Sequence, residues 1–122
     1  MSLPQPLPVP HYAVIFTSKR RSRPGDCYSE TLAQMDTLVR AQPGFLSVDS
    51  VSSIQLVSGI TISYWTDESS IQAWKRNLDH LLAQKKGKSE WYLRYEVRVS
   101  KVERAYTGGI GVDPEHIHEG NN

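Results

Sequence analysis

Apolar residues recur along the chain with two periods, and the changes between these periods divide it into six predicted elements. Residues 12–17 form a short apolar run containing two side chains branched at Cβ, which predicts a strand covered on both faces at its centre. Residues 45–53 and 60–65 alternate between apolar and polar side chains. Because a Ser58-Gly59 turn precedes the second run, the two runs predict an antiparallel hairpin.

Two segments have the period of an amphipathic helix. Asp26 is a suitable N-cap for the first helix, and Pro43-Gly44 ends it. The predicted buried stripe of this helix consists of Tyr28, Leu32, Met35 and Val39, joined by Thr31 and Leu38. Thr66 or Asp67 caps the second helix. The apolar stripe of the second helix is Ile71, Trp74, Leu78, Leu81 and Leu82, and a second stripe nearly opposite is Ala73, Asn77, His80 and Gln84.

The last predicted strand has the most regular alternation in the chain. Its apolar face consists of Trp91, Leu93, Tyr95, Val97 and Val99. Arg94, Glu96 and Arg98 occupy the other face, where they could neutralise an anionic group or form a cross-strand ladder of ion pairs. Because the apolar phase slips between Val99 and Val102, we expect a bulge or bend there and an extension of the strand through Arg104.

The predicted order is βαββαβ, which is typical of the ferredoxin-like α+β sandwich, with one antiparallel four-stranded sheet and both helices on one face. The other face would expose an apolar patch larger than monomers normally tolerate, so we expect a twofold homodimer in which a second copy covers it. The folded domain is predicted to span residues 12–106. The Pro-rich residues 1–11 predict an extended N-terminal arm, and the Gly-rich residues 107–122 predict a flexible C-terminal tail.

The composition argues against several classes of protein. A chain of 122 residues is long enough for one domain, and a net charge of +1 gives no field that favours nucleic acid or an anionic membrane. The single Cys27 cannot form an internal disulfide, and no leader or apolar run of about 18 residues is present. We therefore expect a cytoplasmic protein. His116 and His118 could ligate a metal, but a flexible tail supplies no preformed geometry, so we expect no metal site.

The residues at the ends of these elements carry a family resemblance. They are the Gln42-Pro43-Gly44-Phe45 turn, Gly59, Tyr64-Trp65, Trp74-Lys75, His80, Gly87, Trp91-Tyr92 and the ending Val102-Glu103-Arg104-Ala105-Tyr106. Over about residues 12–106 the chain resembles an uncharacterised branch of the antibiotic biosynthesis monooxygenase (ABM) domain family. The resemblance implies a dimeric α/β barrel with a pocket between sheet and helices in each subunit. It also implies one of three activities, namely cofactor-independent oxygenation of aromatic polyketides, haem degradation, or binding of a small molecule without reaction.

The resemblance also indicates which chemistry to expect. In haem-degrading members an Asn on the first strand, a Trp on the second helix and a His ten residues after that Trp act together. Trp74 matches the Trp, but Gln84 occupies the position ten residues later. The first strand offers Thr17 and Ser18 in place of Asn. Haem is therefore disfavoured as cofactor or substrate, and we expect no cofactor.

The candidate site lies around the junction between residues 60–65 and the second helix. We expect the substrate to contact Tyr64, Trp65, Trp74, Tyr92 and Arg98. Tyr64 and Trp65 point to opposite faces of their strand, so only one of them can join a given pocket. His80 is the candidate base, and Asn77 or Tyr92 is the candidate donor to a developing oxyanion.

Each candidate also has a structural interpretation. Trp74 can be a core residue, His80 a surface or interface histidine, and Cys27 a small filler at the start of the first helix. Two functions therefore stay open. One is a cofactor-independent monooxygenase acting on a small aromatic or quinol-like compound, and the other is a small-molecule-binding or stress-responsive dimer without catalysis.

Overall fold

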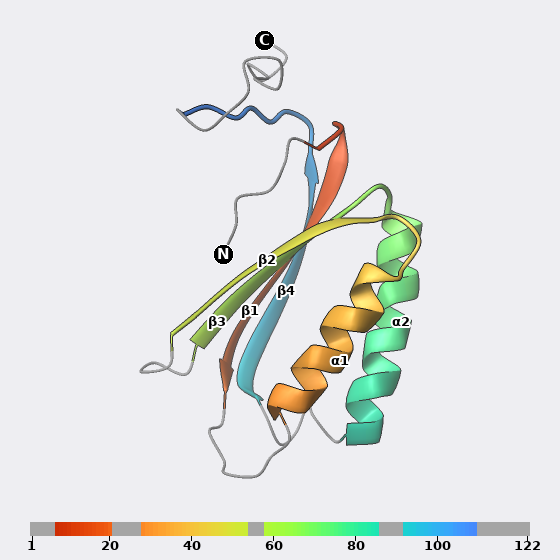
Figure 1. The fold of residues 1–122 in the computed structure, drawn as a ribbon, viewed down its shortest axis with the longest axis vertical. Helices are drawn as coiled ribbons and strands as arrows, with labels where there is room; N and C mark the ends of the chain where they lie inside the picture. Colours follow the sequence, from red (N-terminus) through yellow and green to blue (C-terminus); the bar gives the residue numbers. More distant parts are fainter. Residues whose placement is uncertain (1–6, 21–27, 54–57, 86–91, 110–122) are drawn as a thin grey trace.

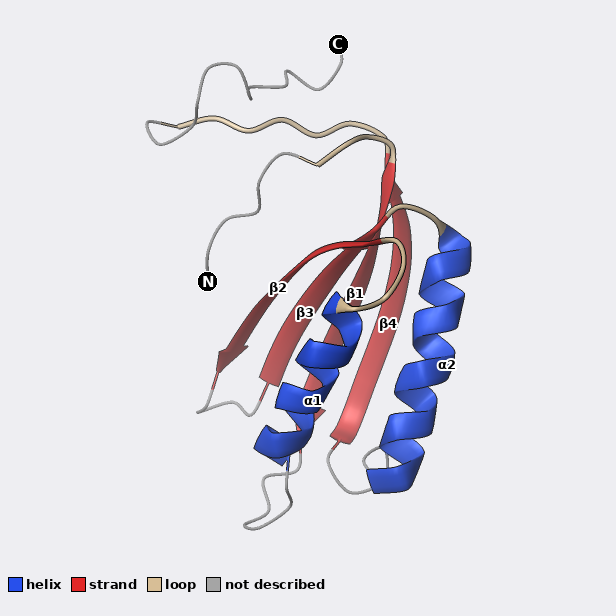
Figure 2. Ribbon diagram, turned by 45° about the vertical axis from the view of Figure 1, so that its right-hand side comes forward, coloured by secondary structure: helices blue, strands red, loops and turns tan. Residues whose placement is uncertain are grey.

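The described residues form one antiparallel sheet with two helices packed on the same side of it (Figure 1). The structure is a computed structural model that describes residues 7–20, 28–53, 58–85 and 92–109. The elements are β1 (His11–Arg20), α1 (Tyr28–Arg40), β2 (Phe45–Ser53), β3 (Ser58–Trp65), α2 (Glu68–Lys85) and β4 (Tyr92–Val102). Figure 2 shows α1 in front of the strands and α2 beside β4. The strand order of the sheet is β2-β3-β1-β4. The predicted ferredoxin-like α+β class is confirmed.

The last strand differs from its prediction at both ends. Its pairing with β1 continues without a shift from Val99 to Val102, so the bulge predicted there is wrong, as is the extension through Arg104. The apolar phase slips because Val102 lies opposite His11 on the other face of the sheet from Val99. The register shifts instead between Lys19 and Arg20, at the opposite end of the pair.

A tight turn between α1 and β2 brings the end of one helix against the start of the other. Gly44 adopts a positive φ of 82° in this turn, which favours glycine. Its carbonyl accepts a hydrogen bond from the backbone N–H of Thr66 at 2.9 Å. The next residue, Asp67, is the N-cap of α2, as predicted, because its Oδ1 accepts the N–H of Ser70 at 2.8 Å. The other predicted cap, Asp26, lies outside the described residues.

The core lies between the sheet and the helices. Its buried residues are Val39, Trp65, Ile71, Trp74, Leu82 and Tyr92. The predicted apolar stripe of α2 is confirmed, because Leu78 packs against these residues and Leu81 is half-buried. Leu32 is a correction: it is exposed, because the core contacts of α1 are made by Met35, Leu38 and Val39, nearer the turn into β2. Among the described residues, no helix is long and apolar enough to cross a membrane.

Candidate functional site

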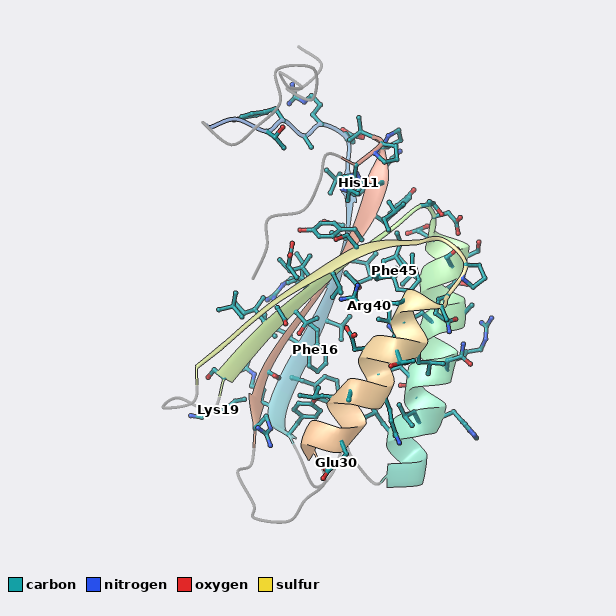
Figure 3. The ribbon with its side chains drawn as sticks, in the orientation of Figure 1. His11, Phe16, Lys19, Glu30, Arg40 and Phe45 are labelled. Atoms are coloured by element: carbon teal, nitrogen blue, oxygen red, sulfur yellow. The ribbon has the colours of Figure 1, made fainter. Side chains whose placement is uncertain are left out.

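Strand pairing divides the sheet into two faces with different chemistry. Directly paired residues point to the same face, and Tyr12 pairs with Trp65, which packs against both helices. Positions 12, 14, 16, 18 and 20 of β1 therefore face the helices, and positions 11, 13, 15, 17 and 19 face away. We call the second side the open face of the sheet. Figure 3 shows Phe16 and Phe45 in the layer between the strands and the helices.

One half of the helix-facing layer is closed. Trp65 has 0% of its surface exposed, and its ring stacks on that of Trp74 with centroids 6.3 Å apart. Phe45 meets Trp65 edge-on at 5.7 Å. The indole Nε1–H of Trp65 donates to Ser63 Oγ at 2.8 Å, which satisfies the only polar group of that buried side chain. These contacts place both tryptophans in the core.

The other half of the layer, along β4, is open. Phe16 lies 5.5 Å from the ring of Tyr92 and 5.6 Å from that of Tyr95, between ring centroids. Tyr95, Val97 and Val99 follow on the same face and keep 41%, 51% and 49% of their surface exposed. We call these three residues the β4 strip. An exposed aromatic and branched aliphatic strip, beside two more rings, is a surface on which a flat apolar molecule can lie.

Tyr92 reaches this layer through the shift in register. An unbroken alternation along β4 would put Tyr92 on the same face as Arg94. Instead, the pairing of β4 with β1 shifts between Lys19 and Arg20 and turns Tyr92 toward the helices. It is buried there against Leu82. The side chains of Trp91 and Leu93 lie outside the described residues.

The open face holds the remaining predicted ligand contacts. Tyr64 meets the buried ring of His11 edge-on at 5.7 Å, and the Nδ1–H of His11 donates to the carbonyl of Pro8 at 2.9 Å. Burial and the negative charge of Asp49 raise the pKa of Tyr64. Arg98 pairs with Glu96 on its own strand at 2.8 Å, so this pair lies within a strand, not across strands as predicted. Tyr64 and Arg98 are therefore separated by the sheet from Trp65, Trp74 and Tyr92.

The candidate catalytic residues lie on α2, away from the sheet. His80 is exposed, almost opposite Leu78 around the helix axis, and it makes no hydrogen bond with another described residue. Asn77 is exposed as well, and its Nδ2–H donates to Oε1 of Gln42 at 3.1 Å. The structure thus brings Asn77 next to the end of α1. It brings neither residue to the β4 strip.

Sequence reasoning missed Phe16, Tyr95, Val97 and Val99 as candidate site residues. Their alternation marked them as core, because an apolar strand face is usually covered. The lengths of the strands were a signal that part of the sheet would stay exposed. Two helices cannot cover four strands of eight to eleven residues evenly. Which strand would stay uncovered depends on helix placement, which the periodicity of the chain does not encode.

Sequence comparison now places the chain among known proteins. It is 45% identical over 95 residues to the uncharacterized protein YqjZ of Bacillus subtilis, a match that covers 78% of this chain and 82% of YqjZ. The chain belongs to the family of YqjZ. No family model matches the sequence.

Comparison with solved structures identifies proteins that share the fold of this chain. SnoaB from Streptomyces nogalater, a cofactor-independent oxygenase, superposes with a TM-score of 0.61 at 12% identity, over 85% of this chain and 100% of SnoaB. Rv0793 from Mycobacterium tuberculosis superposes with a TM-score of 0.59 at 20% identity, over 81% of this chain and 99% of Rv0793. A Nitrosomonas europaea protein, named provisionally as an antibiotic biosynthesis monooxygenase, superposes with a TM-score of 0.61 at 13% identity, over 75% of this chain and 88% of that protein. The expected ABM fold is confirmed.

The layer of this YqjZ relative does not fit haem. Trp74, which matches the Trp of the haem-degrading members, has its ring buried against Trp65 and cannot lie against a macrocycle. Gln84, ten residues later, has a side chain outside the description. In the described part of the chain, no group of three or more His, Cys, Asp or Glu side chains is arranged to hold a metal ion.

An open groove of about 470 Å³ lies between α1 and α2, lined by Ala33, Gln34, Thr37, Leu38 and Leu81. None of the residues expected to contact substrate lines it. The β4 strip is therefore the better candidate site, since it also lies beside a cluster of aromatic rings.

Proposed function

We propose that this protein is a monooxygenase of the ABM type that acts on a small aromatic or quinol-like compound without metal or flavin. The observation that carries the proposal is the β4 strip, where Tyr95, Val97 and Val99 expose apolar surface beside the rings of Phe16 and Tyr92. Planar apolar compounds bind such surfaces by stacking and burial. The shared fold of SnoaB, a cofactor-independent oxygenase, supports the reaction type.

The proposed reaction needs no external reductant. A ring CH₂ group activated by a neighbouring carbonyl loses a proton, and the resulting carbanion transfers electrons to dioxygen. The carbon becomes a carbonyl, one oxygen atom stays in the product, and the other leaves as water together with the two hydrogens of the CH₂ group. The substrate supplies all four electrons. The protein has to bind the ring, keep water away from it and stabilise the developing oxyanion.

The described side chains suggest how these tasks are divided. Tyr95 offers an exposed ring face for stacking, and its hydroxyl is a donor that suits an oxyanion. Trp65 and Trp74 hold the closed half of the layer. His80 was the predicted base and Asn77 its companion, but both lie on the outer side of α2. We expect His80→Ala to retain turnover.

Oxygen consumption tests the proposal directly. The probe is 1,8-dihydroxyanthrone, with EDTA present and uptake measured by an oxygen electrode above the spontaneous rate. Val97→Asp places a charge on the β4 strip and should abolish the uptake. Leu32→Asp makes the same change of charge at an exposed apolar site on α1 and should leave it intact. Uptake that never exceeds the spontaneous rate with this probe and related quinols would refute the oxygenase.

Binding without catalysis is the second candidate. It is favoured by the outward positions of His80 and Asn77, which leave no predicted base beside the β4 strip. In that case the aromatic probe should raise the melting temperature of the protein, and Val97→Asp should remove the increase. Oxygen uptake would stay at the spontaneous rate.

We further propose a twofold homodimer that buries the open face of the sheet. Val51 and Ile60 are paired across β2 and β3 on this face and keep 57% and 47% of their surface exposed. Ile15 and Ile62 lie beside them and are only half-buried. A second copy would cover these side chains. A cytoplasmic location stays a prediction from the sequence.

A further inference from the structure

The helix-facing side of the sheet carries charge only at its ends. Arg20 lies at one end of the layer, opposite Tyr92, and Lys101 lies at the other, opposite Tyr12. The carboxylates of the described strand residues, Asp49 and Glu96, are both on the open face. A molecule on the β4 strip would therefore lie on apolar side chains with a positive charge at either end of the layer. It would meet no carboxylate from the described strands.

Lys101 is the cation that a ligand can reach. It follows Val99 by two residues on the same face of β4, a separation of about 7 Å along the strand. Its side chain is exposed and forms no ion pair with another described residue. Arg20, in contrast, already interacts with other residues of the protein. The flexible stem of a lysine lets its ammonium group move over the neighbouring apolar surface.

We propose that Lys101 makes the β4 strip selective for planar aromatic molecules that carry an anionic substituent, such as aromatic carboxylates. The ring lies over Val97 and Val99, with Tyr95 at its far edge, and the anion meets the ammonium group of Lys101. This ligand class rests on the strip proposed above as the binding site, but it does not require that oxygenation takes place. An exposed charge pair of this kind predicts a preference of about threefold to fivefold at low salt.

Matched ligands test the selectivity. The probes are 2-naphthoate and the neutral 2-naphthamide, which share the ring system, and their dissociation constants are measured by calorimetry at low ionic strength. The naphthoate should bind about threefold to fivefold more tightly to the unmodified protein, and high salt should reduce the difference. Lys101→Met should remove the preference while binding of the amide stays the same. Lys101→Arg should restore it.

Lys19→Met is the control, because Lys19 is an exposed lysine of the same sheet that points to the open face. It should keep the full preference. Equal affinity for both probes, binding of neither probe, or an unchanged preference in Lys101→Met would overturn the proposal. A dimer that Val97→Asp dissociates would assign the strip to a second copy and would also overturn it. Neither probe has an activated CH₂ group, so failure of the oxygenase leaves this result untouched.

Discussion

Gly44 holds a backbone conformation that other residues adopt only under strain. Its φ is 82°, and a Cβ at this position would come within 2.6 Å of Ser70 Cβ and 2.9 Å of Thr66 Oγ1. We expect Gly44→Ala to lower the free energy of unfolding by at least about 1–3 kcal/mol, the usual cost of a left-handed non-glycine residue, with the steric contact added. Urea unfolding measures the loss. Gly108→Ala is the control, since nothing lies within 4 Å of the added methyl group, and an equal loss there would contradict the prediction.

Asp67 links the stability of α2 to pH. The backbone N–H of Ser70 and the hydroxyl of Ser69 both donate to its carboxylate at 2.8 Å, and together with further hydrogen bonds they hold its pKa well below the ordinary value. Because the pKa of Asp67 is lower in the folded protein, its carboxylate stabilises the folded state fully above the unfolded pKa of about 4. This stabilisation is lost as the pH falls from there through the folded pKa. Asp67→Ala should therefore melt at a lower temperature than the unmodified protein at pH 7.

The same pair of proteins should converge in acid. Below the unfolded pKa of about 4 the unfolded chain binds a proton that the folded carboxylate of Asp67 does not, so the stabilisation weakens and the difference in melting temperature should shrink. Asp67→Asn keeps an oxygen that caps the helix, so it should retain more stability than Asp67→Ala at pH 7. Circular dichroism melts at pH 7 and pH 3 make the comparison. A difference between the unmodified protein and Asp67→Ala that grows in acid would show that the carboxylate is not the stabilising form.

At the scale of elements, β4 shows what the periodicity of the sequence predicts correctly and what it does not predict. Tyr95, Val97 and Val99 share a face as their alternation predicts, and that face turns toward the helices. The position of the shift in register was predicted wrongly, because it depends on how β1 pairs with β4, and pairing between distant strands leaves little trace in local sequence. The candidate site residues on β4 were missed because their exposure depends on where the helices lie.

The placement of Tyr92 can be tested by stability alone. Tyr92 is buried against Leu82 and Phe16, whereas Tyr95 keeps 41% of its surface exposed. Tyr92→Ala should therefore cost about 3 kcal/mol of unfolding free energy, as large buried aromatic residues do. Tyr95→Ala should cost only about 1 kcal/mol, because a smaller area returns to water. Chemical denaturation gives both values, and the reverse order would show that the alternation continues unbroken through Tyr92.

At the scale of the whole molecule, the two faces of the sheet differ in the side chains that they carry. The order and type of the elements could be predicted from the sequence, because each has a period and end signals of its own, such as Asp67 and Gly44. The sequence predicted less reliably on which face of the sheet each candidate site residue lies. Tyr64 and Trp65 were separated correctly by alternation, but Arg98 lies across the sheet from Trp74, so the five expected ligand contacts do not line one pocket. A second copy on the open face would give Tyr64 and Arg98 a shared environment of their own.

The open face predicts a dimer that a single charge should dissociate. Ile60→Lys places an ammonium group among apolar side chains that a second copy would bury, but Ile60 is exposed within one chain, so the subunit should still fold. Sedimentation velocity should give the unmodified protein about twice the chain mass of 13.8 kDa and Ile60→Lys the mass of a single chain. Leu32→Lys makes the same change on α1 and should stay dimeric. A monomeric unmodified protein would contradict the dimer, and a dimer that survives Ile60→Lys would place the interface elsewhere. Because the β4 strip faces the helices, ligand binding there should persist in a monomeric Ile60→Lys protein.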